Sequence, residues 1–430
     1  MKTVVILVLL VGSLFAKIDL YKFENSDANA TLFIIGGIHG NEPGGYLAPA
    51  ILAKYYTITS NNLWVIPNLN KPSIMANRRG VNGDMNRKFA HVKENDKDKE
   101  IVLAVKKLIQ DKKVSLILNL HDGHGFYRKK YDNTVFNPNA WGQSCVIDQC
   151  KINLDSSQKE YKDLEQIATK ITKNINKRLL KKHHKFNVKN TKTKFDDEAM
   201  QLSLTYYAVT NKKPAFAIET SKNLSSVSQK VFYQLLAIEE FMKMMHINYI
   251  RHFELTDKGI KKVLKEYGTL NINDNISLDL TDIKKHLSYI PLKSKHNEFK
   301  FSHSLGQIQK SDEGYKVYIG NKVVTTLKPQ YFEMDSSCKS DFTVEVDGKI
   351  RHTKYDSELT VHDYFKVIGD SSVRVNVIGF SKTGHKDESN LKVTLKDLNQ
   401  RYSIDKKHKK YRIEFYKKDK FCSMSVVHFK

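Results

Sequence analysis

A histidine and a glutamate stand three residues apart in the stretch FIIGGIHGNEPGG, which covers Phe33–Gly45. An imidazole and a carboxylate at this spacing can converge on one cation, and Zn²⁺ accepts nitrogen and oxygen ligands while it keeps a fourth position open for water. Taken alone, His39 and Glu42 are better explained as a loop histidine and a solvated glutamate. A metal site therefore needs a third ligand, and a hydrolytic site also needs a base.

Two further strand-like runs end in residues that can complete such a site. The run Val114–Leu120 leads directly into His121-Asp-Gly-His124, and the run Ala215–Ile218 delivers Glu219. His121 is the better third ligand because it follows its strand at once, whereas His124 fits a loop or a supporting position. A carboxylate at position 219 that faces the ligands can act as general base on a water whose pKa the metal lowers to about 7.

The elements that must position these residues alternate along the first part of the chain. Short apolar runs alternate with amphipathic runs of helical spacing, which predicts a parallel or mixed sheet covered by helices on both faces. Open α/β sheets bind ligands at the carboxyl ends of their strands, which is where these residues fall. The predicted strands are Leu32–Ile35, Leu63–Ile66, Val114–Leu120 and Ala215–Ile218, and the predicted helices are Gly45–Tyr55, Lys99–Gln110, Glu160–Leu180 and Ser226–Met245.

A loop between the first two strand ends is rich in arginine and asparagine. It reads NRRGVNGDMNR from Asn77 to Arg87. Three arginines this close repel one another unless they share an anion, and Arg and Asn side chains offer donors that clamp a carboxylate. The alternative is a solvated basic loop. A metal site beside a carboxylate clamp indicates an exopeptidase or a deacylase of acidic amino acids.

These residues together resemble the zinc carboxypeptidases of the M14 type, over roughly residues 30 to 222. The resemblance implies one Zn²⁺ held by His39, Glu42 and His121, with Glu219 as the base. The remaining roles that it implies are a substrate-carboxylate clamp for Asn86 and Arg87, polarisation of the scissile carbonyl and its oxyanion for Arg79, and orientation of the first histidine ligand for Asp84.

The substrate-capping tyrosine of the digestive enzymes is the part of the pattern without a secure counterpart. Tyr206 or Tyr207 could be considered, but either also fits simple packing in a helix. The step that closes the site over the substrate therefore has no assigned residue.

The layout of the whole chain resembles a narrower group, the cell-shape-determining DL-carboxypeptidases of curved and helical Gram-negative bacteria. Those enzymes remove the terminal meso-diaminopimelate from peptidoglycan tripeptide stems and leave dipeptides. Some members have Gln in place of the first histidine, whereas this chain has His39. The resemblance implies an α/β carboxypeptidase-like domain, with a mixed sheet between helices, followed by two small β-rich domains, and peptidoglycan peptide stems as substrate.

Two features are candidates for recognising the zwitterionic end of diaminopimelate. One is the long loop that holds Tyr127 and Trp141, and the other is the acidic run Asp196-Asp197-Glu198. Each also has a purely structural explanation, since an aromatic side chain can pack a loop and acidic residues can cap a helix. We assign Trp141 to substrate binding as an expectation.

The amino terminus predicts export. Lys2 is followed by an apolar stretch and by Ser13-Leu-Phe-Ala16, which is typical of a secretory signal peptide over residues 1–16. An uncleaved anchor is less suitable because the apolar run is short. The mature chain is then expected in the periplasm.

The remaining chain divides into three predicted domains: a zinc carboxypeptidase domain over 17–247, a β-rich accessory domain over 248–337 and a β-sandwich-like accessory domain over 338–430. Helical spacing fades after Asn248, and short alternating runs with turn signals follow. The strands predicted there are Lys316–Ile319, Val323–Leu327, Phe342–Val346, Val373–Phe380, Leu391–Leu395, Tyr411–Tyr416 and Cys422–Phe429.

Export makes the four cysteines candidates for disulfides. Cys145 and Cys150 can close a small local loop, and we favour this pair. Cys338 and Cys422 can link the terminal domain, which the sequence favours less. Free buried thiols are the alternative for both pairs.

The formal net charge of +24 raises the question of nucleic acid. The excess is mostly lysine, is spread over the whole chain and comes with no nucleic-acid motif, so we expect no nucleic-acid partner. A basic surface suits an anionic polymer such as a cell wall, or a membrane face. Wall components or shape-complex proteins are possible partners of the β-rich domains.

Two other functions fit part of the sequence. A zinc N-deacylase of acylated amino acids uses the same ligand and clamp pattern, but its small cytosolic substrates agree poorly with export. A non-catalytic peptidoglycan-binding scaffold agrees with the β-rich domains, but the complete set of ligands and base argues against it.

Overall fold

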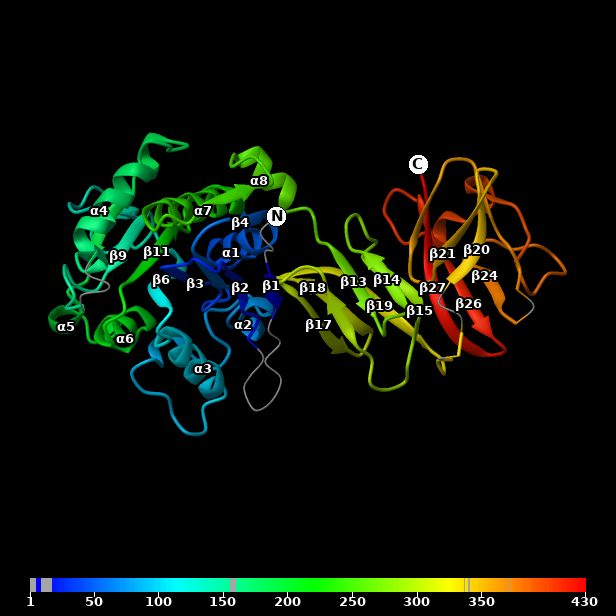
Figure 1. Ribbon diagram of the computed structural model, residues 1–430, viewed down its shortest axis with the longest axis horizontal. Helices are drawn as coiled ribbons and strands as arrows, with labels where there is room; N and C mark the ends of the chain where they lie inside the picture. The colour runs from blue at the N-terminus through cyan, green and yellow to red at the C-terminus, as the bar shows by residue number, and fades with distance from the viewer. Residues whose placement is uncertain (1–4, 9–17, 155–159, 336, 339–340, 371) are drawn as a thin grey trace. The chain divides into compact units, whose positions relative to one another are not determined.

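The chain folds into two compact units, Met1–Leu264 and Lys265–Lys430. The structure is a computed structural model that describes residues 5–8, 18–154, 160–335, 337–338, 341–370 and 372–430 (Figure 1). No helix among the described residues combines the length and apolar character that crossing a membrane requires.

The first unit is built on a mixed sheet of eight strands in the order β1-β2-β5-β3-β6-β11-β9-β10. Neighbours β5, β3, β6 and β11 run parallel, as do β9 and β10, whereas β11 pairs with β9 in the antiparallel sense. The strands are β1 (Val5–Val8), β2 (Tyr21–Glu24), β3 (Thr31–Ile35), β5 (Asn62–Ile66), β6 (Val114–Gly123), β9 (Ser144–Ile147), β10 (Asn187–Asn190) and β11 (Ala215–Ser221).

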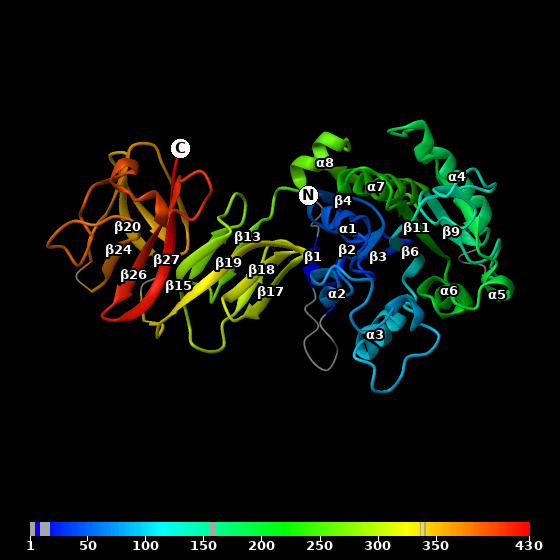
Figure 2. The same cartoon turned by 180° about the vertical axis from the view of Figure 1, so that it is seen from behind.

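Helices cover both faces of this sheet (Figures 1 and 2). On one face α1 and α4 pack against α7, and on the other face α3 and α6 lie against β6 and β11. The helices are α1 (Pro43–Tyr55), α2 (Lys71–Met75), α3 (Lys99–Ile109), α4 (Leu164–Ile175), α5 (Thr193–Asp196), α6 (Leu204–Thr210), α7 (Val227–Met244) and α8 (Asp257–Val263). The predicted mixed sheet between helices is confirmed.

The central strands form where the sequence is continuously apolar because helices bury both of their sides. Every residue of β3, β5 and β6 is buried, and their apolar side chains belong to one core. The four predicted strands and three of the predicted helices match observed elements closely. The helix predicted over Glu160–Leu180 is shorter, because Asp163 caps its start at the backbone N–H of Gln166 and Asn176 bonds the backbone of Phe186 where it ends.

The first unit continues past the predicted boundary at residue 247. The strand β12 (Tyr249–Arg251) pairs with β4 (Tyr56–Ile58), and α8 packs on α7. Most of the predicted signal peptide lies outside the described residues. Within it, Val5–Val8 form β1 and pair with β2.

The second unit is rich in β-strands, as predicted. Its largest sheet has the path β16-β13-β14-β27-β26-β24, with β22 also on β27, and a four-stranded sheet has the order β15-β19-β18-β17. The first comprises β16 (Phe299–Phe301), β13 (Thr269–Ile272), β14 (Ile276–Asp279), β27 (Lys420–Phe429), β26 (Lys410–Lys417), β24 (Arg374–Val377) and β22 (Glu358–Val361); the second comprises β15 (His286–Leu292), β19 (Lys322–Tyr331), β18 (Gly314–Ile319) and β17 (Gly306–Ser311).

A third sheet of this unit has the order β21-β20-β23-β25. Its strands are β20 (Asp341–Val346), β21 (Lys349–Lys354), β23 (Tyr364–Val367) and β25 (Val393–Thr394). Strands from before and after residue 337 share the largest sheet, because Ile276 of β14 pairs with Met424 of β27. Residues 265–430 are grouped in one compact unit.

The cysteines pair differently from the favoured prediction. Cys338 and Cys422 form a disulfide, while Cys145 and Cys150 are free. The local pairing was wrong because Cys145 lies within β9 with its side chain in the buried core. Cys150 lies beyond the end of that strand, exposed, and its sulfur accepts a hydrogen bond from Asn190.

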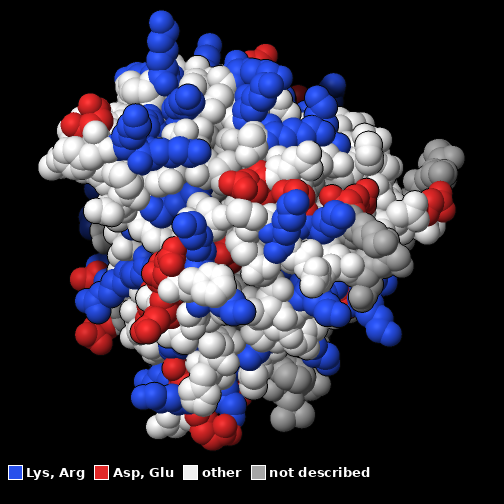
Figure 3. Space-filling view, turned by 90° about the vertical axis from the view of Figure 1, so that its left-hand side faces the viewer, with Lys and Arg blue, Asp and Glu red and all other residues white. Residues whose placement is uncertain are grey.

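Basic side chains are dispersed over the one face of the molecule that Figure 3 draws. On the face drawn in Figure 3, lysine and arginine side chains lie over the whole view among fewer acidic ones. This distribution is consistent with the dispersed lysines of the sequence.

Candidate active site

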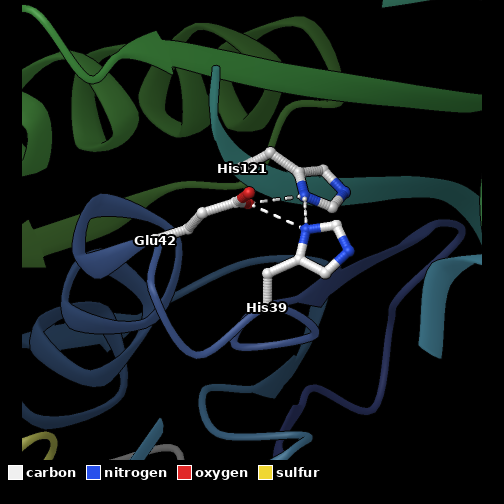
Figure 4. A group of neighbouring side chains, drawn as sticks. All are labelled: His39, Glu42 and His121. Atoms are coloured by element: carbon white, nitrogen blue, oxygen red, sulfur yellow. Dashed lines mark hydrogen bonds and ion pairs between the residues drawn. The ribbon is translucent and has the colours of Figure 1, made fainter. Parts of the chain in front are cut away.

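Two histidines and a glutamate converge at the carboxyl ends of the central strands (Figure 4). Oε2 of Glu42 lies 3.1 Å from Nδ1 of His39 and 2.9 Å from Nδ1 of His121, and the two Nδ1 atoms are 3.2 Å apart. All three residues are buried. Two of them come from the turn after β3 and one from β6 itself.

The spacing of the three atoms suits a small metal ion. In a tetrahedral site with ligand distances of about 2.1 Å, ligand atoms lie about 3.4 Å apart. The observed separations are close to this value, and two nitrogens that face one carboxylate oxygen match the donors that zinc accepts. His39, Glu42 and His121 therefore fit a metal ion.

Glycine allows the helix that carries Glu42 to approach the strand that carries His121. A Cβ at Gly44 would lie 2.3 Å from Oδ1 of Asp122, and the backbone N–H of Gly44 donates to Oδ2 of the same carboxylate at 2.9 Å. Asp122 is buried, and burial raises its pKa to about 6. The start of α1 is thus fixed directly beside His121.

The charges within the ligand group are strongly coupled. Burial lowers the pKa of His39, but the Glu42 and Asp84 carboxylates outweigh this and raise it above its ordinary value. Burial would raise the pKa of Glu42, but the two histidines hold it well below its usual range. Burial lowers the pKa of His121. An ionised carboxylate between two imidazoles is the state that a cation requires.

Asp84 connects the ligand group to the arginine loop. Its Oδ1 lies 2.8 Å from Nε2 of His39 and accepts the backbone N–H of Asn86 at 2.9 Å, while its Oδ2 accepts Nε–H of Arg79 at 2.9 Å. The carboxylate fixes the histidine so that Nδ1 faces the other ligands. Despite the burial, bonds to His39 and Arg79 hold the pKa of Asp84 far below its usual range.

A cavity of about 270 Å³ opens beside the three ligands. Glu219 lines it from β11, whose register places this residue next to His121 on β6. Burial raises the pKa of Glu219 well above its usual range, and repulsion from the Glu42 and Asp122 carboxylates adds to this effect. A carboxyl group with a raised pKa beside a candidate metal site is suited to general acid and base catalysis.

The arginine loop supplies the opposite wall of the site. Arg79, Asn86 and Arg87 all line the cavity, and Nη1 of Arg79 donates to Oε1 of Glu42 at 3.3 Å. The side-chain oxygen of Asn86 accepts the backbone N–H of Leu204 at 3.0 Å, which leaves its amide N–H groups as donors. The cavity therefore combines a candidate metal group, a carboxylate and three side chains that can bind an anion.

Trp141 also lines the cavity, and a lysine fixes its position. Nζ of Lys189 donates to the carbonyl oxygens of Pro138 at 2.7 Å and Ala140 at 3.3 Å. The same Nζ lies 4.8 Å from the centre of the Trp141 ring and 4.5 Å from that of Tyr127. Lys189 lies on β10, whose residues are only partly buried and gave no sequence signal.

Asn119 is a second residue that the sequence analysis missed. It lies two positions before His121 on β6, so its side chain points to the same face, and it lines the cavity. It is fully buried, yet neither polar atom of its side chain has a hydrogen-bond partner among the described residues. Such a group is stabilised when a polar ligand pairs with it.

The remaining residues considered from the sequence do not belong to the group of three ligands. Tyr207 packs on Phe89 and accepts a hydrogen bond from Gln110, so it belongs to the helix packing. Asp196, Asp197 and Glu198 do not line the cavity, and Asp197 caps the backbone N–H of Met200. His124 lines the cavity but is not one of the three converging residues.

The catalytic-domain model of a peptidase family, described as carboxypeptidase controlling helical cell shape, matches residues 2–265. The chain belongs to this family. A second family model, described as the C-terminal domain of metallo-carboxypeptidase, matches residues 335–430 and begins close to the predicted boundary at 337. The candidate active site is thus that of a metallocarboxypeptidase. No match is found among curated proteins.

Solved structures of a cell-shape carboxypeptidase have the same fold over nearly the whole chain. The apo cell shape determinant protein Csd4 from Helicobacter pylori is 31% identical, covers 96% of this chain and 100% of its own, and has a TM-score of 0.89. Its tripeptide-bound form is 32% identical over the same shares, with a TM-score of 0.89. The mDAP-bound form, described as a D,L-carboxypeptidase, is 32% identical over 94% of this chain and 98% of its own, with a TM-score of 0.87.

Proposed function

We propose that this protein is a zinc-dependent D,L-carboxypeptidase that removes the C-terminal meso-diaminopimelate from peptidoglycan tripeptide stems, leaves dipeptides and thereby sets cell shape. The observation that carries the proposal is the convergence of His39, Glu42 and His121 in one cavity with Glu219 and an arginine–asparagine wall. The tripeptide-bound and mDAP-bound forms of Csd4 supply the substrate class.

Zinc is the metal that we propose for the site. Two imidazole nitrogens and one carboxylate oxygen are a donor set typical of catalytic zinc, which leaves a fourth position free. Magnesium and calcium prefer sites made of oxygen atoms. When bound, the ion supplies a Lewis acid that polarises a water and the substrate carbonyl.

The residues around the ligands have distinct tasks in this reaction. Arg87 and the amide of Asn86 bind the terminal carboxylate of the stem peptide, which places the preceding amide bond beside Glu219. Glu219 takes a proton from the attacking water and returns it to the leaving amine. Arg79, held by Asp84, donates to the oxygen that gains negative charge as the carbonyl is attacked.

The cavity floor favours a terminal residue with a polar side chain. A buried amide without partners is costly beside an alkyl side chain. Beside diaminopimelate, its N–H can donate to the side-chain carboxylate and its oxygen can accept from the amino group. Asn119 provides this amide, and Trp141, fixed by Lys189, forms a wall of the same cavity. These residues support recognition of diaminopimelate rather than of an apolar residue.

Periplasmic action also belongs to the proposal. The apolar amino-terminal segment supports export by a signal peptide, and the dispersed lysines suit an anionic wall. Wall components and proteins of a shape complex are possible partners of the second unit.

The decisive experiment is digestion of purified muropeptides by the full chain, read out by mass. We expect tripeptide stems to lose one diaminopimelate residue, activity to disappear with a chelator, and zinc to restore it. Cleavage of N-acyl amino acids but not of tripeptides would favour the deacylase. Retained binding to sacculi without zinc content or cleavage would favour the scaffold, and either result would contradict the proposal.

A further inference from the structure

A second cavity lies within the unit Lys265–Lys430, and none of the metal-ligand candidates lines it. It measures about 140 Å³ and is lined by residues of β15, of β26 and of the segment 401–404. Its volume is below the several hundred Å³ of sites that enclose a whole small molecule, so it suits one functional group of a larger ligand. The proposed reaction does not involve this cavity, and the packing of the sheets does not require it.

An irregularity in β15 forms one wall of this cavity. Leu287 pairs with Leu327 and Ile290 with Pro329, so Ser288 and Tyr289 together face a single residue of β19. Tyr289 has a φ of 59°, which a side chain other than glycine rarely adopts, and its side chain is 62% exposed. Bulges and strained residues of this kind are concentrated where a structure presents groups to a ligand.

The floor of the cavity is a buried arginine. Arg412 is 3% exposed, and its Nη1 donates to the carbonyl oxygen of Tyr289 at 2.9 Å, so the bulge and the guanidinium are directly connected. Its Nε has no hydrogen-bond partner among the described residues. Glu414 lies 3.4 Å from Nη1 and offsets this charge, while its second oxygen accepts the hydroxyl of Tyr416.

Further cationic groups surround the mouth. Arg401 is exposed and lines the cavity, and no carboxylate among the described residues pairs with it. Lys284 donates to the carbonyl oxygens of Gln400 and Arg401. Asp405 attracts Lys284, but its oxygens accept backbone N–H groups of Lys407, Lys409 and Lys410. Positive charge therefore exceeds negative charge at this cavity.

We propose that this cavity binds a carboxylate group of a short peptide, with Arg401 and Arg412 as the recognising residues and Tyr289 and Tyr402 beside its mouth. Arginine binds carboxylates through paired N–H donors, and exposed tyrosines add contact area at little entropic cost. The choice of a wall peptide as the natural ligand rests on the proposed function. The second unit then binds a carboxylate group of a wall peptide.

The test uses the arginine Nε–H signals in nitrogen-correlated NMR spectra of the full chain, which has ten arginines. The probe is N-acetyl-D-alanine, and the matched probe without the charge is N-acetyl-D-alaninamide. Arg401→Gln removes the Nε–H signal of Arg401, which identifies that signal, and should weaken binding of the probe at the cavity. Arg351→Gln is the control, because it changes an exposed arginine that does not line the cavity. Tyr289→Gly is a second variant, which relieves the left-handed backbone and keeps both arginines.

We expect the carboxylate probe, but not the amide, to shift the signals of Arg401 and Arg412 in a saturable way. Arg401→Gln should weaken this binding about tenfold, and Arg351→Gln should leave it unchanged. The signals of Arg79 and Arg87 serve as an internal standard for binding of the carboxylate probe at the candidate active site. If these two signals do not respond, the result contradicts the proposed function and not the second site. Saturation of those two without any response of Arg401 and Arg412, or an equal response to the amide, would overturn the proposal.

Discussion

Replacement of Asp84 by asparagine should weaken metal binding without unfolding the chain. The carboxylate accepts three hydrogen bonds, from Asn86, Arg79 and the Nε2 side of His39. An asparagine oxygen in the place of Oδ1 can keep the bonds to His39 and Asn86. Its amide nitrogen would then face Nε–H of Arg79, so two donors would meet and the charge beside His39 would be lost.

The expected loss of metal affinity corresponds to the one hydrogen bond, to Arg79, that this substitution removes. One charge-assisted hydrogen bond contributes about 1.5 to 3 kcal/mol, and the lower end applies here because the Arg79 side chain is 46% exposed and water replaces part of the bond. We therefore expect metal affinity to fall about tenfold and no more than about a hundredfold. The value for kcat should fall by about tenfold as well, because Arg79 loses its fixed position.

Zinc affinity is measured by competition with a chelator of known strength, and kcat and KM by release of diaminopimelate from a tripeptide. Asp96→Asn is the matched control, since this carboxylate pairs with Lys88 and does not line the cavity. Unchanged zinc affinity in Asp84→Asn would refute the role of this residue in orienting His39. A loss of equal size in the control would attribute the effect to the loop as a whole.

Three further changes test other parts of the site. Glu219→Gln should keep zinc bound and lower kcat by about 10² to 10⁴-fold, and near-normal turnover would contradict its role as base. Because its surroundings raise the pKa of Glu219 in the folded chain, this carboxyl group lowers the stability of the metal-free protein at neutral pH. In calorimetry at pH 7, metal-free Glu219→Gln should therefore melt at a higher temperature than the metal-free parent. The difference in melting temperature should disappear as the pH falls below about 4.3, the ordinary pKa of a glutamate. Asn119→Leu should raise KM for diaminopimelate stems more than for stems with an apolar terminal residue, and equal effects on both would exclude a role in specificity. Lys189→Met should raise KM and change the fluorescence of Trp141, whereas Lys189→Arg should restore both; a kcat effect alone would argue against positioning.

The sequence was sufficient for the elements that are buried on both faces. The strands that carry His121 and Glu219 are predominantly apolar before these residues, which is typical of strands buried on both faces of a sheet. Because parallel strands end at the same edge, residues that follow them meet without any further information. The fold class and the grouping of the candidate ligands could therefore be predicted.

Other parts of the site depend on contacts that no local pattern contains. Lys189 lies on a strand of sequence NVKN that is half-buried, so neither hydrophobic alternation nor spacing marks it. Asn119 did carry a signal, since a polar residue within an apolar strand, two positions before His121, must share its face. The pairing of Cys145 with Cys150 failed because closeness in sequence says nothing about side-chain direction, and Cys145 points into the core.

The position of β27 has a consequence for how the second unit folds. This strand lies between β26 on one side and β14 and β22 on the other, and β14 is made far earlier on the ribosome. Until β27 emerges, the edge of β14 that faces away from β13 has no partner strand and stays open to other chains. Pairings between residues as distant as Ile276 and Met424 form slowly. We therefore expect the second unit to fold as a single late event, and a chain cut before Lys420 to aggregate rather than to leave a smaller stable domain.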